Sequence, residues 1–478
     1  MPPIVEKLRD ALGPEVVTTA PDRLERHSHD WSVVAARRPL AVLRPRTTEE
    51  VATALRLCHA AGQSVALQGG RTGVSGGAVP GEGDVALSLD RLVGIAAIDP
   101  AAATMTVEAG TPLQTVQDAA RDAGFFCPLD LGARGSCAIG GNIATNAGGN
   151  RVIRYGMTRQ MVLGLQVVLA DGTVLDMLNT MLKNNAGFDL KQLFIGSEGQ
   201  LGVITRAVLK LEPLPVSSAT AYCGLEGFAA ALAFLQRARA ELAGLLSSFE
   251  IMWPGYYDLI VGTPGRSGAP GIRAPLAGRH GMYVLLETQG ADPESDTRRF
   301  ERFMEACLAA GILEDAALAQ SHEDARAFWA VRDATAEFSA LMGERTEFDL
   351  GLPIARIGAC TAALEATLKA RWPAALTVFY GHLGDGNIHL QVATPGTSPH
   401  PGHAIEDLAY AVMRDHGGTV TAEHGLGTLK APYLGHCRSA AEIALMRRLK
   451  AALDPQGILN PGKVLAAAPS RAAGAART

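Results

Sequence analysis

The sequence predicts an α+β fold in which helices lie on antiparallel sheet. In the first third of the chain, short β-rich runs alternate with amphipathic helices, and later strands are predicted among long helices. Hydrophobic residues make up 47% of the chain and charged residues 19%, which excludes a disordered protein. A length of 478 residues is enough for two or three domains.

Local signals place the first elements in order. Thr47 or Thr48 predicts the start of a helix that runs to about Ala61, because a hydroxyl cap precedes two glutamates in the first turn. Asp171-Gly172 predicts a tight hairpin leading into a strand at 173–175. The other strands predicted in this region are 41–43, 65–67, 85–89, 164–169 and 203–211.

The composition changes after about residue 216, where long helices become frequent. A loop at 262–275 is expected to be exposed because it is rich in Gly, Pro, Ser and Arg. The final residues, 467–478, are small and basic, and we expect them to be disordered. The predicted helices are 228–245, 297–310, 322–342 and 440–453, and the predicted strands are 283–287, 376–380 and 388–392.

Charge, hydropathy and cysteine content exclude several classes of protein. With a net charge of −5, the chain has no strongly basic balance that would point to nucleic acid. No apolar run reaches the roughly 18 residues of a membrane span, and the first residues do not resemble a signal peptide. The seven cysteines form no CxxC pair, so we expect a reduced, cytoplasmic protein.

Two glycine-rich segments, 68–77 and 132–149, suggest a pyrophosphate or dinucleotide site. Glycine allows backbone to approach a ligand closely, and successive N–H groups in such loops bind phosphate. A pair of tight turns with no ligand is the plainer alternative. Hydroxyls within the segments add donors, and these belong to Thr72, Ser75, Ser136 and Thr145.

Histidines and carboxylates form a second group of candidate residues. His382 and His389 flank the predicted turn GDGN, so a hairpin would bring them together, and Glu423 could complete a site for zinc, manganese or iron. On spacing alone, Asp385 could replace Glu423 as a ligand. His424 follows Glu423 and is a candidate general base. The plainer alternative is that the two histidines only flank a turn.

The motifs DLGARGSCAIGGNIATNAGGN, DLKQLFIGSEGQLGVIT, GHLGDGN, TAEHGLG and ILNPGKV carry a family resemblance. Over about residues 38–465, the chain resembles flavoproteins of the vanillyl-alcohol oxidase and p-cresol methylhydroxylase (PCMH) superfamily. Within it, the chain is most similar to D-2-hydroxyglutarate dehydrogenases, D-lactate dehydrogenases and glycolate oxidase flavin subunits.

The resemblance implies a domain order. It implies an N-terminal helix and lead-in (1–37), a PCMH-type FAD-binding domain of two subdomains (38–215) and a ferredoxin-like α+β cap for the substrate (216–418). A C-terminal segment (419–466) would return to the flavin and the metal site, ahead of the tail at 467–478. It also implies a homodimer and an electron-transfer flavoprotein or quinone as the acceptor.

The resemblance also assigns roles to single residues. His382, His389 and Glu423 match metal ligands, His424 a catalytic base, and Arg332 an arginine that binds the substrate α-carboxylate. FAD is expected to be non-covalent, because the first glycine loop contains Arg71-Thr72 and no histidine. The implied FAD-binding residues are Pro45, Gln68, Gly69, Gly70, Arg71, Thr72, Gly73, Ser75, Gly76, Gly77, Leu131, Gly135, Ser136, Gly140, Gly141, Asn142, Thr145, Asn146, Gly149, Glu198, Gly199, Gly202, Ile204, Asn460 and Lys463.

The substrate positions depart from the hydroxyglutarate enzymes. Where those enzymes carry a lysine for the distal carboxylate, this chain has Glu347, and it has Ala336 and Gln391 for a threonine and an asparagine. A glutamate about 4 Å from a substrate carboxylate would cost roughly 4 kcal/mol. Glu347 could turn outward, and Arg345, two residues earlier on a strand, would share its face and could replace the lysine.

The sequence therefore predicts an FAD- and metal-dependent dehydrogenase that converts a D-2-hydroxy acid to the 2-oxo acid by hydride transfer to flavin N5. D-Lactate, D-malate or another D-2-hydroxy acid is the alternative to D-2-hydroxyglutarate. A metal hydrolase and a non-catalytic flavin- or metabolite-binding protein are the competing hypotheses.

Overall fold

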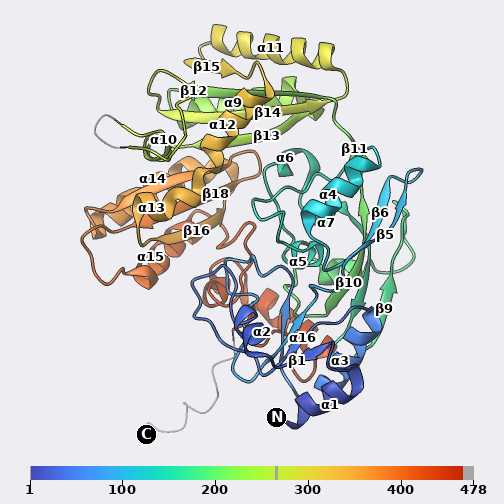
Figure 1. Cartoon of the computed structure of the whole chain (residues 1–478). Helices are drawn as coiled ribbons and strands as arrows, with labels where there is room; N and C mark the ends of the chain where they lie inside the picture. Colours follow the sequence, from blue (N-terminus) through green and yellow to red (C-terminus); the bar gives the residue numbers. More distant parts are fainter. Residues whose placement is uncertain (1, 264–266, 467–478) are drawn as a thin grey trace. The chain divides into compact units, whose positions relative to one another are not determined.

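The computed structural model describes residues 2–263 and 267–466, which fall into two compact units (Figure 1). Unit 1 comprises residues 1–147, 157–213 and 423–478, and unit 2 comprises residues 148–156 and 214–422. The predicted disorder of 467–478 falls outside the described residues. No helix within the described ranges is both long and apolar enough to cross a membrane.

The described residues of unit 1 form a four-stranded sheet, a five-stranded sheet and a two-stranded pair. In the four-stranded sheet, in the order β1-β2-β4-β3, β4 pairs in parallel with β2 and β3. The five-stranded sheet, in the order β5-β6-β10-β8-β9, is antiparallel. The strands are β1 (Val17–Thr18), β2 (Val42–Leu43), β3 (Val65–Gln68), β4 (Val85–Ser88), β5 (Ile95–Asp99), β6 (Thr104–Glu108), β8 (Val162–Val168), β9 (Val174–Met177) and β10 (Val203–Lys210), with a separate pair formed by β7 (Phe125–Phe126) and β11 (Glu212–Pro213).

Two helices of unit 1 begin with side-chain caps, of which the first was predicted from the sequence. The Thr47 hydroxyl accepts a hydrogen bond from the Glu50 amide, which caps α3. Ser439 and Glu442 form a capping box at the start of α16. The helices are α1 (Pro3–Leu12), α2 (Pro21–Arg26), α3 (Thr48–Ala61), α4 (Leu113–Asp122), α5 (Ile139–Thr145), α7 (Thr158–Met161), α8 (Lys191–Phe194), the 3-10 helix η4 (Ala431–His436) and α16 (Ala440–Leu453).

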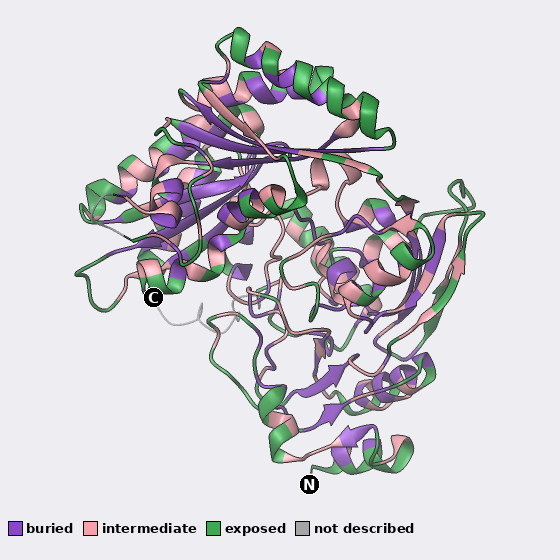
Figure 2. Ribbon diagram, turned by 45° about the horizontal axis from the view of Figure 1, so that its top comes forward, coloured by how far each residue is buried: buried purple, intermediate pink, exposed green. Residues whose placement is uncertain are grey.

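Unit 2 is built on one seven-stranded sheet in the order β15-β12-β14-β13-β17-β18-β16. All neighbouring strands are antiparallel, so the predicted α+β architecture is confirmed. Figure 2 shows these strands as largely buried, whereas α11 has an exposed outer face. The strands are β12 (Ser217–Leu225), β13 (Leu246–Met252), β14 (Met282–Gly290), β15 (Asp315–Leu318), β16 (Thr346–Gly351), β17 (Leu376–His382) and β18 (Asn387–Ala393).

Helices cover both faces of this sheet. On one face, Phe249 of β13 packs against Phe234 of α9, and Phe348 of β16 packs against Tyr410 of α15. On the other face, Tyr380 of β17 packs against Tyr256 of α10. The helices are α6 (Val152–Tyr155), α9 (Phe228–Glu241), α10 (Pro254–Val261), α11 (Pro293–Ala309), α12 (His322–Asp333), α13 (Phe338–Met342), α14 (Ile357–Arg371) and α15 (Gly402–Asp415), with 3-10 turns η1 (Ala243–Leu245), η2 (Ala334–Glu337) and η3 (Ile354–Arg356).

The single long helix predicted for 322–342 is wrong. The chain forms α12, then the 3-10 turn η2, then α13. The buried hydroxyl of Tyr256 donates hydrogen bonds to the carbonyls of Val331 and Arg332, at 2.9 and 2.8 Å. A continuing α-helix would use these same carbonyls for the next turn. The helix predicted for 228–245 is also too long: α9 ends at Glu241, and the 3-10 turn η1 follows it.

Candidate active site

In unit 1, the backbones of the two glycine-rich segments pack directly against each other. The first follows β3, and the second leads into α5. A Cβ atom on Gly70 would lie 2.1 Å from the Ser136 carbonyl oxygen and 2.7 Å from the Cys137 Cα atom. Only glycine allows the two backbones to approach this closely.

Gln68, at the start of the first segment, forms hydrogen bonds through both the oxygen and the nitrogen of its side-chain amide. Its Nε2 donates to the carbonyl oxygens of His27 and Ala78, both at 2.9 Å, and its Oε1 accepts from His27 Nδ1 at 2.6 Å. His27 is fully buried, and burial lowers its pKa to about 4, so the ring is neutral. The sequence around His27 gives no sign of this contact, because its partner lies 41 residues away in sequence.

The second segment leaves a buried polar atom for a ligand. Thr145 Oγ1 donates to the Gly141 carbonyl, and Asn146 ends α5 in the left-handed conformation (φ 51°). Asn142 is buried in the same helix, and its carboxamide oxygen has no hydrogen-bond partner among the described residues. A buried polar atom of this kind, beside glycine-rich backbone, fits a polar cofactor such as FAD.

Asn460 joins three distant parts of unit 1. Its Oδ1 accepts from the Leu67 amide, and its Nδ2 donates to the Glu198 carbonyl, both at 2.8 Å. Lys463 Nζ donates to the same Oδ1 at 3.1 Å. Burial lowers the pKa of Lys463 to about 8. The structure thus brings Asn460 and Lys463 beside β3 and the Glu198 turn.

Glu198 holds the segment that begins with Glu423. Its two carboxylate oxygens accept the amides of Leu426 and Gly427 at 2.7 and 2.8 Å. Burial raises the Glu198 pKa, and these two hydrogen bonds oppose that shift. Ser75 of the first glycine segment donates to the carbonyl of His424 at 3.2 Å. Within unit 1, the backbone of His424 is therefore anchored beside the first glycine segment.

The other residues that the sequence assigned to FAD occupy several places in the fold. Arg71 has a left-handed backbone (φ 58°), and Gly199 (φ 72°) follows Glu198 in its turn. A Cβ atom at Gly76 (φ 75°) would lie 2.4 Å from Thr428 Oγ1. Pro45 lies between β2 and α3, Gly202 precedes β10, and Ile204 pairs with Val167 in the five-stranded sheet. Leu131 and Gly135 lie in the loop before α5, and Gly140 lies in the first turn of that helix, close to Ala109. Gly149 belongs to unit 2.

In unit 2, one sheet face carries a row of ionisable side chains. Side chains alternate across a strand, and the register pairs Glu250 with His382 and Asp349 with His389. The rings of His382 and His389 lie 5.5 Å apart between centroids. All four residues are buried. The structure therefore brings the two predicted metal-binding histidines together and adds two carboxylates that the sequence analysis did not single out.

Glu250 binds two of the predicted site residues. One carboxylate oxygen accepts from Arg332 Nε and the other from His382 Nδ1, each at 2.7 Å. Burial opposes ionisation of Glu250, but the charges and hydrogen bonds of His382 and Arg332 together lower its pKa. Burial also opposes the charge of Arg332, and the Glu250 carboxylate raises the Arg332 pKa in spite of it. The face therefore carries a buried, paired guanidinium.

The end of α12 aims Arg332 at the sheet. Tyr256 binds the carbonyl of Arg332, and the guanidinium lies over the Tyr380 ring, 5.0 Å from its centroid. Burial raises the pKa of Tyr380 to about 12, so its ring stays neutral beside the guanidinium. Arg332 is only 5% exposed. The predicted carboxylate-binding arginine thus lies on the same sheet face as the two histidines.

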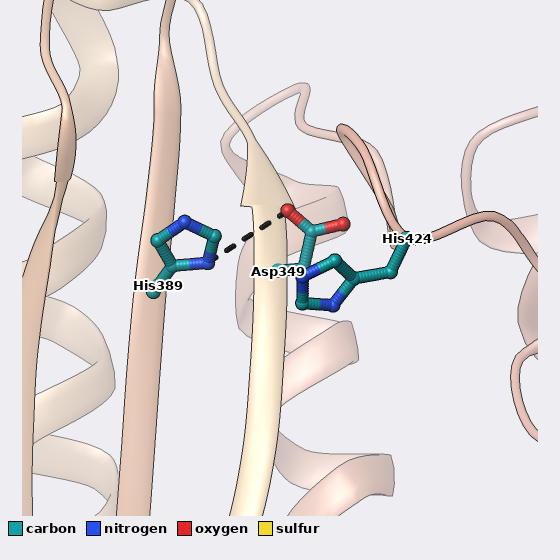
Figure 3. Close-up of side chains that lie close together, drawn as sticks. All are labelled: Asp349, His389 and His424. Carbon is teal, nitrogen blue, oxygen red and sulfur yellow. Dashed lines mark ion pairs between the residues drawn. The ribbon is translucent and has the colours of Figure 1, made fainter. Parts of the chain in front are cut away.

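Asp349 faces His389 from the neighbouring strand (Figure 3). Its Oδ1 lies 3.9 Å from His389 Nδ1 and accepts from Asn387 Nδ2 at 2.8 Å. The Ala422 amide donates to Oδ2 at 3.0 Å. The next residue along the chain is Glu423, the predicted third ligand, and successive Cα atoms are about 3.8 Å apart.

The alternative ligand Asp385 is not supported. Asp385 is exposed and its carboxylate accepts from the Asn387 amide, so it shapes the turn between β17 and β18. Spacing suggested this residue because a tight turn was expected between the histidines. The structure sets Asp349 beside His389. The sequence signal for Asp349 is a charged residue in the middle of a buried strand.

Arg345, Glu347 and Gln391 meet at the edge of the same face. Arg345 donates to Gln391 Oε1 at 3.1 Å and forms a 2.5 Å ion pair with Glu347. The Arg345 side chain is 15% exposed, whereas that of Glu347 is 49% exposed. The predicted outward turn of Glu347 is therefore observed in part, and Arg345 neutralises its charge.

Comparisons with known proteins identify two domains of flavin-linked enzymes in this chain. Residues 39–178 match the model of an FAD binding domain, and residues 214–464 match that of the C-terminal domain of FAD linked oxidases. The chain is 41% identical to the mitochondrial D-2-hydroxyglutarate dehydrogenase of Bos taurus over 95% of this chain and 82% of that protein. It is 37% identical to D-2-hydroxyglutarate dehydrogenase of Xanthomonas citri, over 97% of each chain.

The fold is similar to that of solved flavoenzymes. p-Cresol methylhydroxylase superposes with a TM-score of 0.76 at 17% identity, over 97% of this chain and 96% of the other. The PCMH-type fold predicted from the sequence is thus confirmed. FAD is the cofactor that the matched domains bind, so the enzyme is an FAD-dependent oxidoreductase.

We expect Gly70→Ala to reduce flavin binding more than tenfold, because the added methyl group must displace the Ser136 backbone. Overpacking of this kind costs about 1–3 kcal/mol. The measurement is the ratio of flavin to polypeptide in purified protein, from the visible and ultraviolet absorbance.

Gly435→Ala is the matched control. A Cβ atom at Gly435, in the 3-10 helix η4 and outside the two glycine segments, would meet nothing within 4 Å. We expect this variant to keep its flavin. Normal flavin content in Gly70→Ala would contradict the close packing of the two glycine segments.

Proposed function

We propose that this chain, which belongs to the family of FAD-linked oxidases that includes the D-2-hydroxyglutarate dehydrogenases, oxidises a D-2-hydroxy acid to the 2-oxo acid. The observation that carries the proposal is the buried guanidinium of Arg332 beside His382 and His389 on one sheet face. A 2-hydroxy acid offers its carboxylate to Arg332 and its hydroxyl, on the adjacent carbon, to the side of the guanidinium where the histidines lie.

Arg332 binds the α-carboxylate of the substrate. Its Nε is taken by Glu250, so the fork that suits a carboxylate is formed by the two terminal nitrogens, one of which lies 3.5 Å from His382 Nε2. Tyr380 lies under the guanidinium and excludes water from one side of it. The paired and buried charge therefore fixes the orientation of the substrate before reaction.

His424 accepts the proton of the substrate hydroxyl at a ring nitrogen. Its backbone is held by Ser75, so the position of the ring depends on the same glycine segment that serves the cofactor. FAD, when bound, supplies the acceptor for the hydride from the α-carbon. The cofactor provides the redox chemistry, and these side chains provide orientation and proton transfer.

We further propose that His382, His389 and Glu423 hold a divalent metal, with zinc preferred and manganese or iron as alternatives. The support is the pair of buried histidines on β17 and β18, and the anchoring of Ala422, the residue before Glu423, by Asp349. Two imidazoles and one carboxylate suit these ions and leave coordination positions open. A bound metal supplies Lewis acidity that favours the ionised hydroxyl.

The FAD site is proposed to consist of the glycine segments 68–77 and 132–149, the Glu198 turn, Asn460 and Lys463. Non-covalent attachment, an electron-transfer flavoprotein or quinone as acceptor, a homodimer and a cytoplasmic location remain predictions from the sequence. The binding of FAD itself is supported by the matched domains.

Substrate size depends on the edge of the sheet face where Arg345 lies. Arg345 offers a cation for a second substrate carboxylate, but Glu347 competes with that carboxylate for the same guanidinium. Because Glu347 is half exposed, solvent weakens its repulsion below the roughly 4 kcal/mol of two like charges about 4 Å apart at an effective dielectric constant near 20. We therefore propose a dicarboxylate such as D-2-hydroxyglutarate, with D-malate or D-lactate as the alternative substrate.

The proposal predicts that one D-2-hydroxy acid bleaches the visible flavin band under anaerobic conditions. The zinc-loaded protein is mixed with D- and L-lactate, malate and 2-hydroxyglutarate, and absorbance is followed. Treatment with a chelator should abolish bleaching and leave the flavin bound. In His424→Ala, the flavin should stay bound but bleach far more slowly.

Bleaching by L-acids alone, or by no 2-hydroxy acid, would contradict the proposed activity. Full bleaching after removal of the metal would instead contradict only the metal. Normal bleaching in His424→Ala would remove His424 as the base.

Exchange of Glu347 tests the substrate assignment separately. In Glu347→Gln, we expect kcat/KM for D-2-hydroxyglutarate to rise roughly tenfold, the factor given by about 1.4 kcal/mol, with no change for D-lactate. Arg345→Met should lower kcat/KM for the dicarboxylate alone. Equal effects on both substrates would show that Arg345 and Glu347 do not contact a second carboxylate.

A further inference from the structure

Glu250 occupies a position that the proposed chemistry does not yet use. It lies on β13, is 1% exposed, and is the register partner of His382 on β17. Its two oxygens bind different groups, Arg332 Nε and His382 Nδ1, each at 2.7 Å. One carboxylate thus joins the group proposed to bind the substrate to a group proposed to bind the metal.

The first consequence concerns the tautomer of His382. An ionised carboxylate can only accept hydrogen bonds, so His382 Nδ1 must carry the proton in its bond to Glu250. In the neutral ring, the lone pair is then on Nε2. A histidine that donates one ring N–H to a carboxylate binds metal through the other nitrogen, and the bond fixes the orientation of the ring.

The second consequence concerns charge. A terminal nitrogen of the Arg332 guanidinium lies 3.5 Å from His382 Nε2. A cation bound at Nε2 would therefore lie close to another cation in a buried setting, where charges repel strongly. The negative charge of Glu250, which contacts both Arg332 and His382, offsets this repulsion.

We propose that Glu250 is a positioning residue that holds His382 with Nε2 directed at the metal and holds Arg332 beside it, so that metal and substrate can bind together. The inference rests on the proposed function, since it gives Glu250 a role only if His382 binds a metal. Glu250 itself contacts neither metal nor substrate.

Zinc affinity tests this role without turnover. Metal-free protein that keeps its flavin is titrated with zinc against a chromophoric chelator, for the wild type and for Glu250→Gln. Gln keeps the shape of Glu250 but has no charge, and it cannot accept from both partners through two oxygens. We expect the zinc dissociation constant to rise tenfold to a hundredfold, the range found when a carboxylate behind a metal-binding histidine is lost.

Glu287→Gln is the matched control. Glu287 is also buried and lies on β14, the strand next to β13, on the same sheet face. It also binds α12, through Trp329 Nε1 at 3.0 Å, and it pairs with Arg151. Loss of its charge should disturb packing to a similar degree but leave zinc affinity unchanged within about twofold.

A second variant covers the case in which Glu250→Gln does not fold. Glu250→Asp keeps the buried charge, but its shorter side chain cannot reach Arg332 and His382 at once. Its zinc affinity should fall less than that of Glu250→Gln but remain below the wild type, with a thermal midpoint recorded for each metal-free protein.

Wild-type zinc affinity in a folded Glu250→Gln or Glu250→Asp protein would overturn the positioning role and leave the proposed metal site intact. An equal loss in Glu287→Gln would also overturn it, because the effect would then come from packing. Failure of the wild type to bind zinc would instead overturn the metal part of the proposed function.

Discussion

The proposed site depends on one face of an antiparallel sheet, where ionisable side chains are buried and must find partners among themselves. Side chains alternate along a strand and helices cover both faces of this sheet, so Glu250 and His382 would stay buried on either face. A buried charge without a partner costs several kcal/mol. Pairing of Glu250 with Arg332 and His382 avoids that cost, and it holds the three side chains in one geometry. Strand register and polar pairing therefore reinforce each other.

Unit 1 achieves a similar result with amides and glycines in place of charges. Asn460 bonds to Leu67 and Glu198, which are 393 and 262 residues away in sequence. Gly70 allows the two glycine segments to touch. The proposed cofactor site is thus complete only when the last part of the chain has joined the first.

The sequence predicts features that depend on neighbours in the chain. The Thr47 cap begins α3 as expected, and Asp171-Gly172 forms the turn between β8 and β9 with Gly172 at φ 85°. The resemblance to a known family correctly predicted the fold class and the flavin. His382 and His389 were expected to meet across a hairpin, and β17 and β18 form that hairpin.

Features that depend on distant partners were missed. Glu250 lies 132 residues from His382, and nothing in its local sequence marks it as more than a strand residue. The break after α12 was also missed, because the group that binds its last carbonyls is Tyr256, about 75 residues away. In both cases the information lies in tertiary contacts. Burial of a polar side chain on a strand is the signal that points to them.

Anomalous scattering from crystals of the zinc-loaded protein would test the central claim most directly. The account predicts one zinc peak about 2.0–2.1 Å from His382 Nε2, with His389 and Glu423 as the other protein ligands and Glu250 bound only to His382 Nδ1 and Arg332. Zinc bound at His382 Nδ1, zinc bound by Glu250, or no peak beside the two histidines would contradict it.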